Sequence, residues 1–420
     1  MKNQILIAAL FASATFGQAQ IVSIPDAKFK ASLLAISPTI DLNNDNEIQE
    51  TEAAKVTLLD VSRKSITSLA GIEKFTVLSK LDCSKNDIKI LNISQNTLLT
   101  SLECGDNLLP SLDVSKNTAL TSLSCSINQL VNLDVTKNTE MATLYCSYNK
   151  FTQIDFTKNT AIKYLDCSSN KLETLDVSKN TVLTTLICDY NKLTTLEFTK
   201  NAKLAQLYCN DNQLTSLDVT KNTLLTWLWC NSNQLTSIDV TKNTALTNFV
   251  CNKNQLTTLD VSKNTALPQL YCNDNQLTSI NLTQNSALIW LSCHNNRLTS
   301  LDVSKNSALG TLYCNNNKLA SLDVSKNTLL GTMWCSENPN LKIICINTDQ
   351  ISITSSWQKD AAAQWSTTCL PTAVDDEMLA TLKTLLHVVT TLGKEISESQ
   401  ATNGVYIYQY SDGTSKKIAK

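Results

Sequence analysis

Residues 207–227 read Leu-Tyr-Cys-Asn-Asp-Asn-Gln-Leu-Thr-Ser-Leu-Asp-Val-Thr-Lys-Asn-Thr-Leu-Leu-Thr-Trp, and nearly the same 21 residues recur along most of the chain. An Asn stands three residues after each repeated Cys, and an apolar residue, nearly always Leu, stands two residues before it. A register kept this long identifies a repeat protein. The cysteines that keep the register are Cys83, Cys104, Cys125, Cys146, Cys167, Cys188, Cys209, Cys230, Cys251, Cys272, Cys293, Cys314 and Cys335.

The repeated unit L-x-C-x-x-N-x-L resembles the leucine-rich-repeat pattern L-x-x-L-x-L-x-x-N-x-L over roughly residues 78–340. The resemblance implies a solenoid with one short parallel β-strand in each 21-residue coil and little helix. The residues agree with it, because Leu and Cys alternate and would both point inward from a strand, with their neighbours pointing outward. The Asn side chain is expected to bond backbone groups of the following turn.

The regular cysteines have two interpretations. Disulfides or a metal site would be the chemical one, but in-register parallel neighbours have poor geometry for disulfides. The spacing also lacks the close Cys pairs of zinc sites. Buried Cys behaves as a small apolar residue, so we expect these side chains to form part of the core.

The other half of the unit carries an Asp row and, three residues later, a Lys row. Where the Asp is replaced by Asn92 or Asn281, the Lys becomes Gln95 or Gln284. This joint change suggests that each Asp and Lys form a local pair on a solvated, charge-balanced face. A calcium-binding Asp ladder is the alternative, which the matching Lys row disfavours.

The positions one and three residues before each Cys should project from the strand onto the exposed sheet face. They hold most of the aromatic side chains of the repeats, beside a polar row directly after the Cys. An aromatic band with amides is suited to binding a protein or a glycan, although cross-strand stacking that only stabilises the sheet is the alternative. The predicted ligand-binding face comprises Tyr145, Tyr164, Tyr208, Trp227, Trp229, Tyr271, Trp290, Tyr313 and Trp334, with Asn210, Asn231, Asn252 and Asn273.

Residues 41–52 resemble the twelve-residue calcium loop of EF-hand and dockerin modules. The sequence departs from that family at Asn46, where Gly is expected, although Asn tolerates a left-handed turn better than most residues. The resemblance implies a structural calcium in an N-terminal cap, and an Asx-rich turn without metal is the alternative. The implied ligands are Asp41, Asn43, Asp45, Glu47 through its carbonyl, Gln49 and Glu52.

The two ends of the chain indicate export. Residues 1–19 combine a basic start, a short apolar run and small residues before the cut, which predicts a signal peptide. In an exported chain Cys345 and Cys369, which leave the 21-residue register, are candidates for a disulfide. Residues 392–395, 404–407 and 416–420 resemble the end of the C-terminal sorting domain of type IX secretion substrates of Bacteroidetes, without its upstream Pro-Asn-Pro strand. An ordinary β appendage is the alternative.

These patterns predict five segments and a secreted or outer-surface location. No segment of the mature chain is expected to span a membrane, and the net charge of −2 disfavours nucleic acid as a partner. The predicted segments are a signal peptide (1–19), an N-terminal helical cap with the calcium-like loop (20–77), the repeats (78–340), a C-terminal cap (341–371) and a small β domain for type IX sorting (372–420).

The sequence favours a binding protein over an enzyme. Its two histidines, His294 and His387, are isolated, and it contains no hydrolase, metalloprotease or phosphate-loop motif. We expect no cofactor apart from the calcium considered above. The partners expected are an extracellular protein, recognised by adhesion, or alternatively a glycan, and the type IX secretion machinery through the tail. A passive surface protein is the second alternative.

Overall fold

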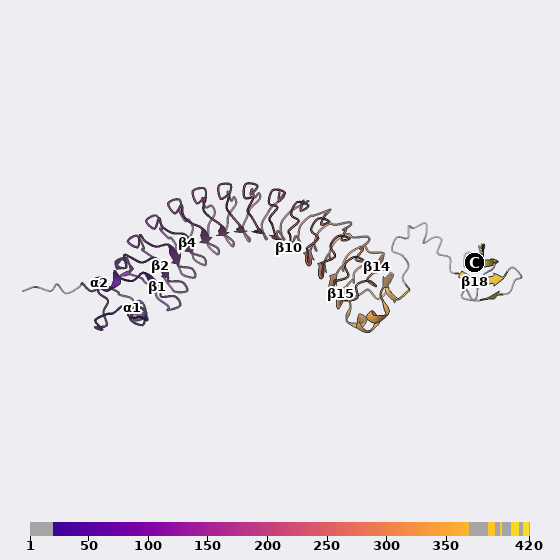
Figure 1. The fold of residues 1–420 in the computed structure, drawn as a ribbon, viewed down its shortest axis with the longest axis horizontal. Helices are drawn as coiled ribbons and strands as arrows, with labels where there is room; N and C mark the ends of the chain where they lie inside the picture. Colours follow the sequence, from indigo (N-terminus) through magenta and orange to yellow (C-terminus); the bar gives the residue numbers. More distant parts are fainter. Residues whose placement is uncertain (1–19, 369–384, 391–394, 397–404, 411–414, 420) are drawn as a thin grey trace, which may run out of the picture.

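The computed structural model describes residues 20–368 and, beyond them, the backbone of four further strands. Residues 20–368 form a curved solenoid in which the strands line the inner, concave side of the arc (Figure 1). The further strands form an antiparallel sheet in the order β19-β18-β20-β21. They are β18 (Leu385–Thr390), β19 (Glu395–Ile396), β20 (Val405–Tyr410) and β21 (Ser415–Ala419).

Fourteen short strands form one parallel sheet in chain order. From β2 onward each strand residue pairs with the residue 21 positions later in the next coil, as Leu207 does with Leu228, so the repeat length sets the register. The predicted leucine-rich-repeat solenoid is confirmed. The strands are β1 (Leu58–Asp60), β2 (Lys80–Asp82), β3 (Ser101–Glu103), β4 (Ser122–Ser124), β5 (Thr143–Tyr145), β6 (Tyr164–Asp166), β7 (Thr185–Ile187), β8 (Gln206–Tyr208), β9 (Trp227–Trp229), β10 (Asn248–Val250), β11 (Gln269–Tyr271), β12 (Trp290–Ser292), β13 (Thr311–Tyr313) and β15 (Thr332–Trp334).

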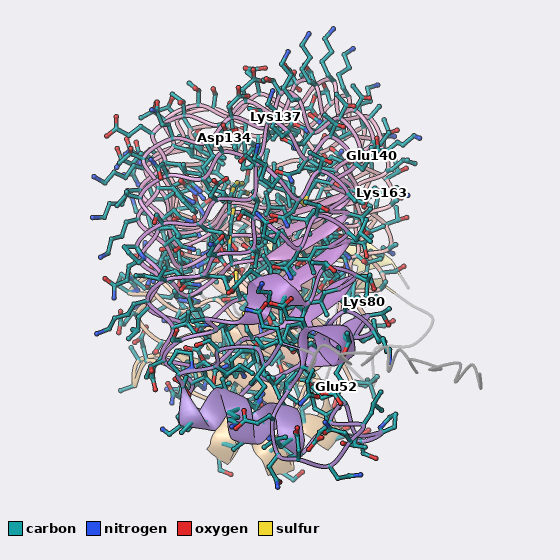
Figure 2. All side chains as sticks on the ribbon, turned by 90° about the vertical axis from the view of Figure 1, so that its left-hand side faces the viewer. Glu52, Lys80, Asp134, Lys137, Glu140 and Lys163 are labelled. Atoms are coloured by element: carbon teal, nitrogen blue, oxygen red, sulfur yellow. The ribbon has the colours of Figure 1, made fainter. Side chains whose placement is uncertain are left out.

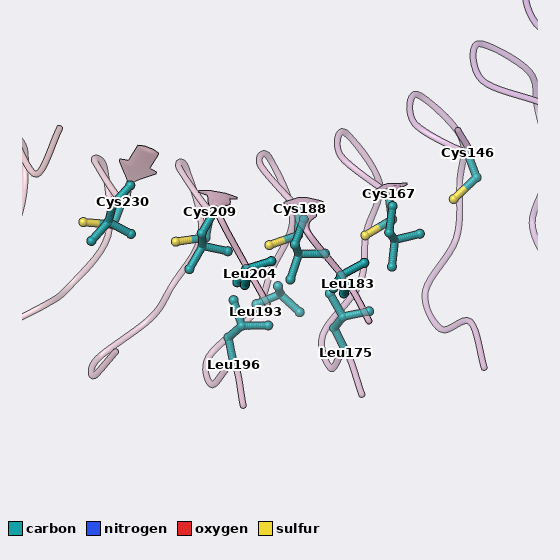
Figure 3. Close-up of a cluster of buried hydrophobic side chains, with 14 of the residues drawn as sticks. Cys146, Cys167, Leu175, Leu183, Cys188, Leu193, Leu196, Leu204, Cys209 and Cys230 are labelled. Atoms are coloured by element: carbon teal, nitrogen blue, oxygen red, sulfur yellow. The ribbon is translucent and has the colours of Figure 1, made fainter. Parts of the chain in front are cut away.

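The core is a stack of similar layers. Leu228 and Cys230 are fully buried, and the equivalent residues of neighbouring coils lie directly beside them. Figure 3 shows the cysteines as a row in which the sulfur atoms point the same way. All thirteen repeat cysteines are free thiols, and burial raises the pKa of Cys230 to about 12. They act as small apolar core residues, as the sequence predicts.

The Asn after each Cys ties adjacent coils together. Asn233 accepts the backbone N–H of Leu214 through Oδ1 at 3.0 Å, and its Nδ2 donates to the carbonyls of Cys209 and Cys230. Both ends of the buried amide are therefore satisfied, which offsets the cost of burying it.

A second Asn row lies in the other half of the coil and is satisfied at one end only. Asn243 donates from Nδ2 to the carbonyls of Val219 and Asn222, at 3.0 and 2.8 Å. Its Oδ1 is buried and has no hydrogen-bond partner among the described residues, as in every equivalent Asn from Asn96 to Asn327. The two rows therefore look alike in sequence but differ in their hydrogen bonds: the first row bonds backbone N–H and carbonyl groups, and the second bonds carbonyl groups alone.

The N-terminal cap covers the first coil with α1 (Ala27–Leu34), α2 (Glu50–Ala53) and the 3-10 helix η1 (Ile72–Lys74). Asp26 begins α1 and accepts the N–H groups of Lys28 and Phe29 through Oδ1. Its Oδ2 accepts two N–H groups and a hydroxyl from Thr67 and Ser68. One carboxylate therefore fixes the helix start to the coil beneath it.

The C-terminal cap contains β14 (Ser321–Asp323), β16 (Ile343–Cys345) and β17 (Gln364–Ser366), which form a parallel sheet, and the 3-10 helix η2 (Thr348–Ser356). Gln350 continues the second Asn row, because its Nε2 donates to the carbonyls of Val324 and Asn327. The indole of Trp357 donates to the Gly331 carbonyl at 3.1 Å. The cap thus provides hydrogen-bond donors for backbone carbonyls that the last coil would otherwise leave unpaired at its open end.

Candidate binding face

The outward sides of the strands carry the predicted aromatic residues. In β9, Leu228 is buried while Trp227 and Trp229 on either side are partly exposed. All nine rings of the predicted face occupy such flanking positions of β5, β6, β8, β9, β11, β12, β13 and β15, and Trp334 is the most exposed, at 40%. We call these nine rings the aromatic face.

The aromatic face consists of three groups of touching rings. The first is the pair Tyr145 and Tyr164, with centroids 4.8 Å apart. In the second, Trp229 lies 5.2 Å from Tyr208 and 6.1 Å from Trp227. The third runs along four coils, and successive centroids lie 6.1, 5.4 and 4.7 Å apart. Its members are Tyr271, Trp290, Tyr313 and Trp334.

A hollow of about 320 Å³ separates the second group from the third. It opens where β10 presents the small side chains of Asn248 and Val250 in register with Trp227 and Trp229 of β9. Short side chains between bulky neighbours therefore create the depression. The hollow is lined by Trp229, Asn231, Asn248, Phe249, Val250, Asn252, Gln269 and Tyr271.

The polar row beside the rings is partly structural. Asn210 and Asn273 are buried, and Oδ1 of Asn210 accepts the N–H of Asn231 at 3.1 Å. Asn231 and Asn252 are partly exposed and line the hollow. Of the four predicted amides, two are therefore open to a ligand and two are covered by neighbouring coils.

Asp189 begins the same polar row and has an unusual acidity. Burial raises the pKa of Asp189 to about 7. The backbone N–H of Asn210 donates to Oδ1 at 2.7 Å, and this bond acts in the opposite direction by lowering the pKa. The carboxylates of Asp166 and Asp211 raise it further. A carboxyl group that titrates near neutrality thus lies between the Tyr164 and Tyr208 strands.

Two indole N–H groups on the aromatic face are not used by the fold. The Nε1 atoms of Trp229 and Trp290 are shielded from solvent and have no hydrogen-bond partner among the described residues. An unpaired donor in such a place costs free energy. The packing of the rings therefore leaves these two donors unsatisfied in this structure.

An acidic ladder that was not among the predicted site residues lies at the N-terminal end of the strand face. Asp60, Asp82 and Glu103 are register partners on β1, β2 and β3. Burial and then the two aspartates raise the pKa of Glu103. The position before each Cys, which supplies most of the rings, holds Asp82 and Glu103 in these first coils, so the same row would have revealed them.

The predicted pairing of the Asp and Lys rows is wrong as a direct contact, because no salt bridge among the described residues joins the two rows. The Lys contributes only a weaker attraction, which lowers the pKa of the Asp, as Lys137 does for Asp134. Asp134 instead accepts the N–H and the hydroxyl of Thr136 through Oδ1, at 2.9 and 2.7 Å, which lowers its pKa. Asn281 keeps the same bond to the N–H of Thr283. The residue serves the turn, while the Lys side chains extend outward; Asp134 and Lys137 are labelled in Figure 2.

The calcium-like loop has the predicted backbone turn. Asn46 adopts φ 62°, the left-handed conformation that the loop needs at this position. Asp41 accepts the N–H groups of Asp45 and Asn46, and Glu52 those of Leu42 and Gln49. Within residues 20–368 no group of three His, Cys, Asp or Glu side chains is placed to hold a metal. Calcium binding stays a prediction.

Other predicted features lie at or beyond the edge of the described residues. Cys345 is disulfide-bonded, but Cys369, its predicted partner, and the signal peptide (1–19) lie outside the described residues. No helix in the described part of the chain is long and apolar enough to cross a membrane.

Comparison with solved structures identifies the family to which this fold belongs. The functional domain of InlJ from Listeria monocytogenes is 33% identical, and the match covers 96% of this chain and 99% of that one, with a TM-score of 0.69. That domain includes a cysteine ladder, like the cysteine row described above. The chain belongs to the leucine-rich-repeat family.

Two further leucine-rich-repeat structures share the fold at lower identity. A protein of Leptospira interrogans is 22% identical over 76% of this chain and 97% of that one, with a TM-score of 0.59. The internalin InlF of Listeria monocytogenes is 20% identical over 83% and 96%, with a TM-score of 0.58. No family model and no curated protein matches this leucine-rich-repeat chain.

Proposed function

We propose that this chain is a secreted or cell-surface protein that binds a protein partner on the aromatic face, in recognition or adhesion, without catalysis. The observation that carries the proposal is the contact between outward rings of adjacent coils. Such contacts gather apolar area on the concave side of the arc, where repeat proteins commonly bind. Aromatic side chains are the usual anchors of protein interfaces.

The fold does not need these rings, which supports a role in binding. The same outward positions hold Ser122 and Ser124 in β4 and Thr185 and Ile187 in β7, and those coils keep the same register. The rings are therefore an addition to a scaffold that forms without them. The matched region of InlJ is its functional domain, which supports placing the function of this chain in its repeats.

Export is part of the same proposal. The signal-like residues 1–19 and the tail that resembles a type IX sorting domain support delivery to the cell surface or the medium. In the described backbone of this tail, β18 to β21 form an antiparallel sheet. Mass spectrometry of culture medium and of intact cells would test this route. We expect it to detect a mature chain that lacks both the signal-like residues 1–19 and the C-terminal tail.

The test of protein recognition uses the full chain on an array of extracellular proteins and glycans. We expect Trp227→Ala/Trp229→Ala to weaken binding to a protein partner by tenfold or more. The matched control is Tyr148→Ala/Tyr190→Ala, which removes two rings that are 60% exposed but lie in the turns after the strands. Equal binding by all three proteins would exclude the aromatic face as the binding surface, and no binding by wild type would favour a passive surface role.

A further inference from the structure

The hollow between β9 and β11 differs from the rest of the aromatic face because it has depth. Val250 is in register with Trp229 on one side and Tyr271 on the other. Strands lie about 4.8 Å apart, so the two aromatic positions are roughly 10 Å apart. Two stacking contacts of about 3.5–4 Å each need roughly 7–8 Å, which leaves room for one puckered ring between the walls.

The polar groups around the hollow have unused hydrogen-bonding capacity. The amides of Asn231 and Asn248 make side-chain bonds only to adjacent hydroxyls at 3.4 Å, and Gln269 only to the hydroxyl of Tyr271, also at 3.4 Å. Asn252 is partly exposed and makes no side-chain hydrogen bond to a described residue. Donors and acceptors thus surround the aromatic walls.

The lining contains no charged side chain, although the Lys and Asp rows are prominent elsewhere on the coils. An ionised ligand would leave its charge unpaired in this hollow, which disfavours anionic sugars and cationic side chains. The lining instead fits a molecule with apolar faces and several neutral polar groups on its edge. A tyrosine side chain of a protein partner would bring only one hydroxyl to the four amides of the lining, whereas a hexose would bring several.

We propose that this hollow binds a neutral hexose unit of a glycan, with its faces against Trp229 and Tyr271 and its hydroxyls on the amides. This site lies within the aromatic face and shares Trp229 and Tyr271 with the protein interface proposed above, but it takes a different class of ligand. It depends on the interruption of the ring series at β10, so a ring introduced there should close it.

The test is Val250→Tyr in the full chain. Tyr occupies the equivalent position as Tyr208 and Tyr271, so the coil accommodates it. The matched control is Ile187→Tyr, the same kind of change at the equivalent position of β7, away from the hollow. A third variant, Asn252→Ala, removes an amide and leaves the hollow open.

The probe is a glycan array with neutral, sialylated and sulfated members, followed by titration of the bound glycan with tryptophan fluorescence as readout. We expect wild type and Ile187→Tyr to bind a neutral glycan equally, Val250→Tyr to lose at least tenfold in affinity, and Asn252→Ala to lose several-fold. Binding to charged glycans alone, to no glycan, or undiminished by Val250→Tyr would overturn the proposal. A protein partner that is lost with Val250→Tyr while no glycan binds would also overturn it, and would leave protein recognition standing.

Discussion

The inward and outward sides of the same strands follow different rules. In β9, Leu228 is fully buried, while Trp227 and Trp229 are partly exposed. Along the sheet the inward position is nearly always Leu, whereas the outward position before each Cys varies, with Asp and Glu in the first coils and mostly Tyr or Trp from β8 onward. The inward side therefore determines that the chain folds, and the outward side determines what the surface presents.

The largest effect should come from the inward side. Leu228→Ala leaves a cavity between the neighbouring core side chains Leu207 and Phe249 and should lower the free energy of unfolding by about 3 kcal/mol. Trp229→Ala, one residue away, should lower it by no more than about 1 kcal/mol, because the ring is partly exposed and packs mainly on Tyr208 and Trp227. Urea unfolding followed by circular dichroism measures both. Equal losses would contradict the division of the strand into two sides.

The two asparagine rows sharpen the comparison within the buried side. Asn233→Ala removes a group bonded at both ends and should cost about 2–3 kcal/mol, since it leaves several buried backbone groups unpaired. Asn243→Ala should cost about 1 kcal/mol less, because its Oδ1 bonds nothing in the described chain. Thermal unfolding of the two variants in one buffer measures the two losses of stability. A larger loss for Asn243→Ala than for Asn233→Ala would contradict the difference between the two rows.

A pH-dependent effect is expected for Asp189, which follows Cys188 in the polar row beside the aromatic face. The pKa of Asp189 is raised from 3.8 to about 7, so the folded state favours the protonated carboxyl group. The contribution of Asp189 to the stability of the folded state is therefore complete below pH 3.8 and is lost as the pH rises to 7. Asp189→Asn, which copies Asn210 of the next coil, should stabilise the protein by about 1–2 kcal/mol at pH 8, allowing for partial exposure. At pH 4 it should have little effect. Urea unfolding at both pH values measures the difference, and a gain independent of pH would contradict it.

Much of the fold could be predicted because each coil contacts only its neighbours. The 21-residue register gave the strand positions, the buried cysteines and the outward rings, and these are present in the structure. The pairing of Asp and Lys failed for a local reason. Asp134 finds the N–H of Thr136 two residues away, and this bond satisfies it without the more distant Lys137.

Parts of the candidate site could not be predicted from the repeat alone. Asn210 and Asn231 occupy equivalent positions, yet one is buried and the other is open to the hollow. The difference depends on the side chains that the neighbouring coils place around each amide. The unpaired indole donors of Trp229 and Trp290 likewise follow from how the rings pack.

The sequence by itself determined the period, the inward rows and the set of residues that face outward, because a repeat of constant length stacks equivalent residues on one another. Only the tertiary structure decided which outward rings touch, where the hollow opens and which amides remain free. These features depend on the sizes of side chains in three successive coils and on their packing. The local sequence of one coil does not contain that information.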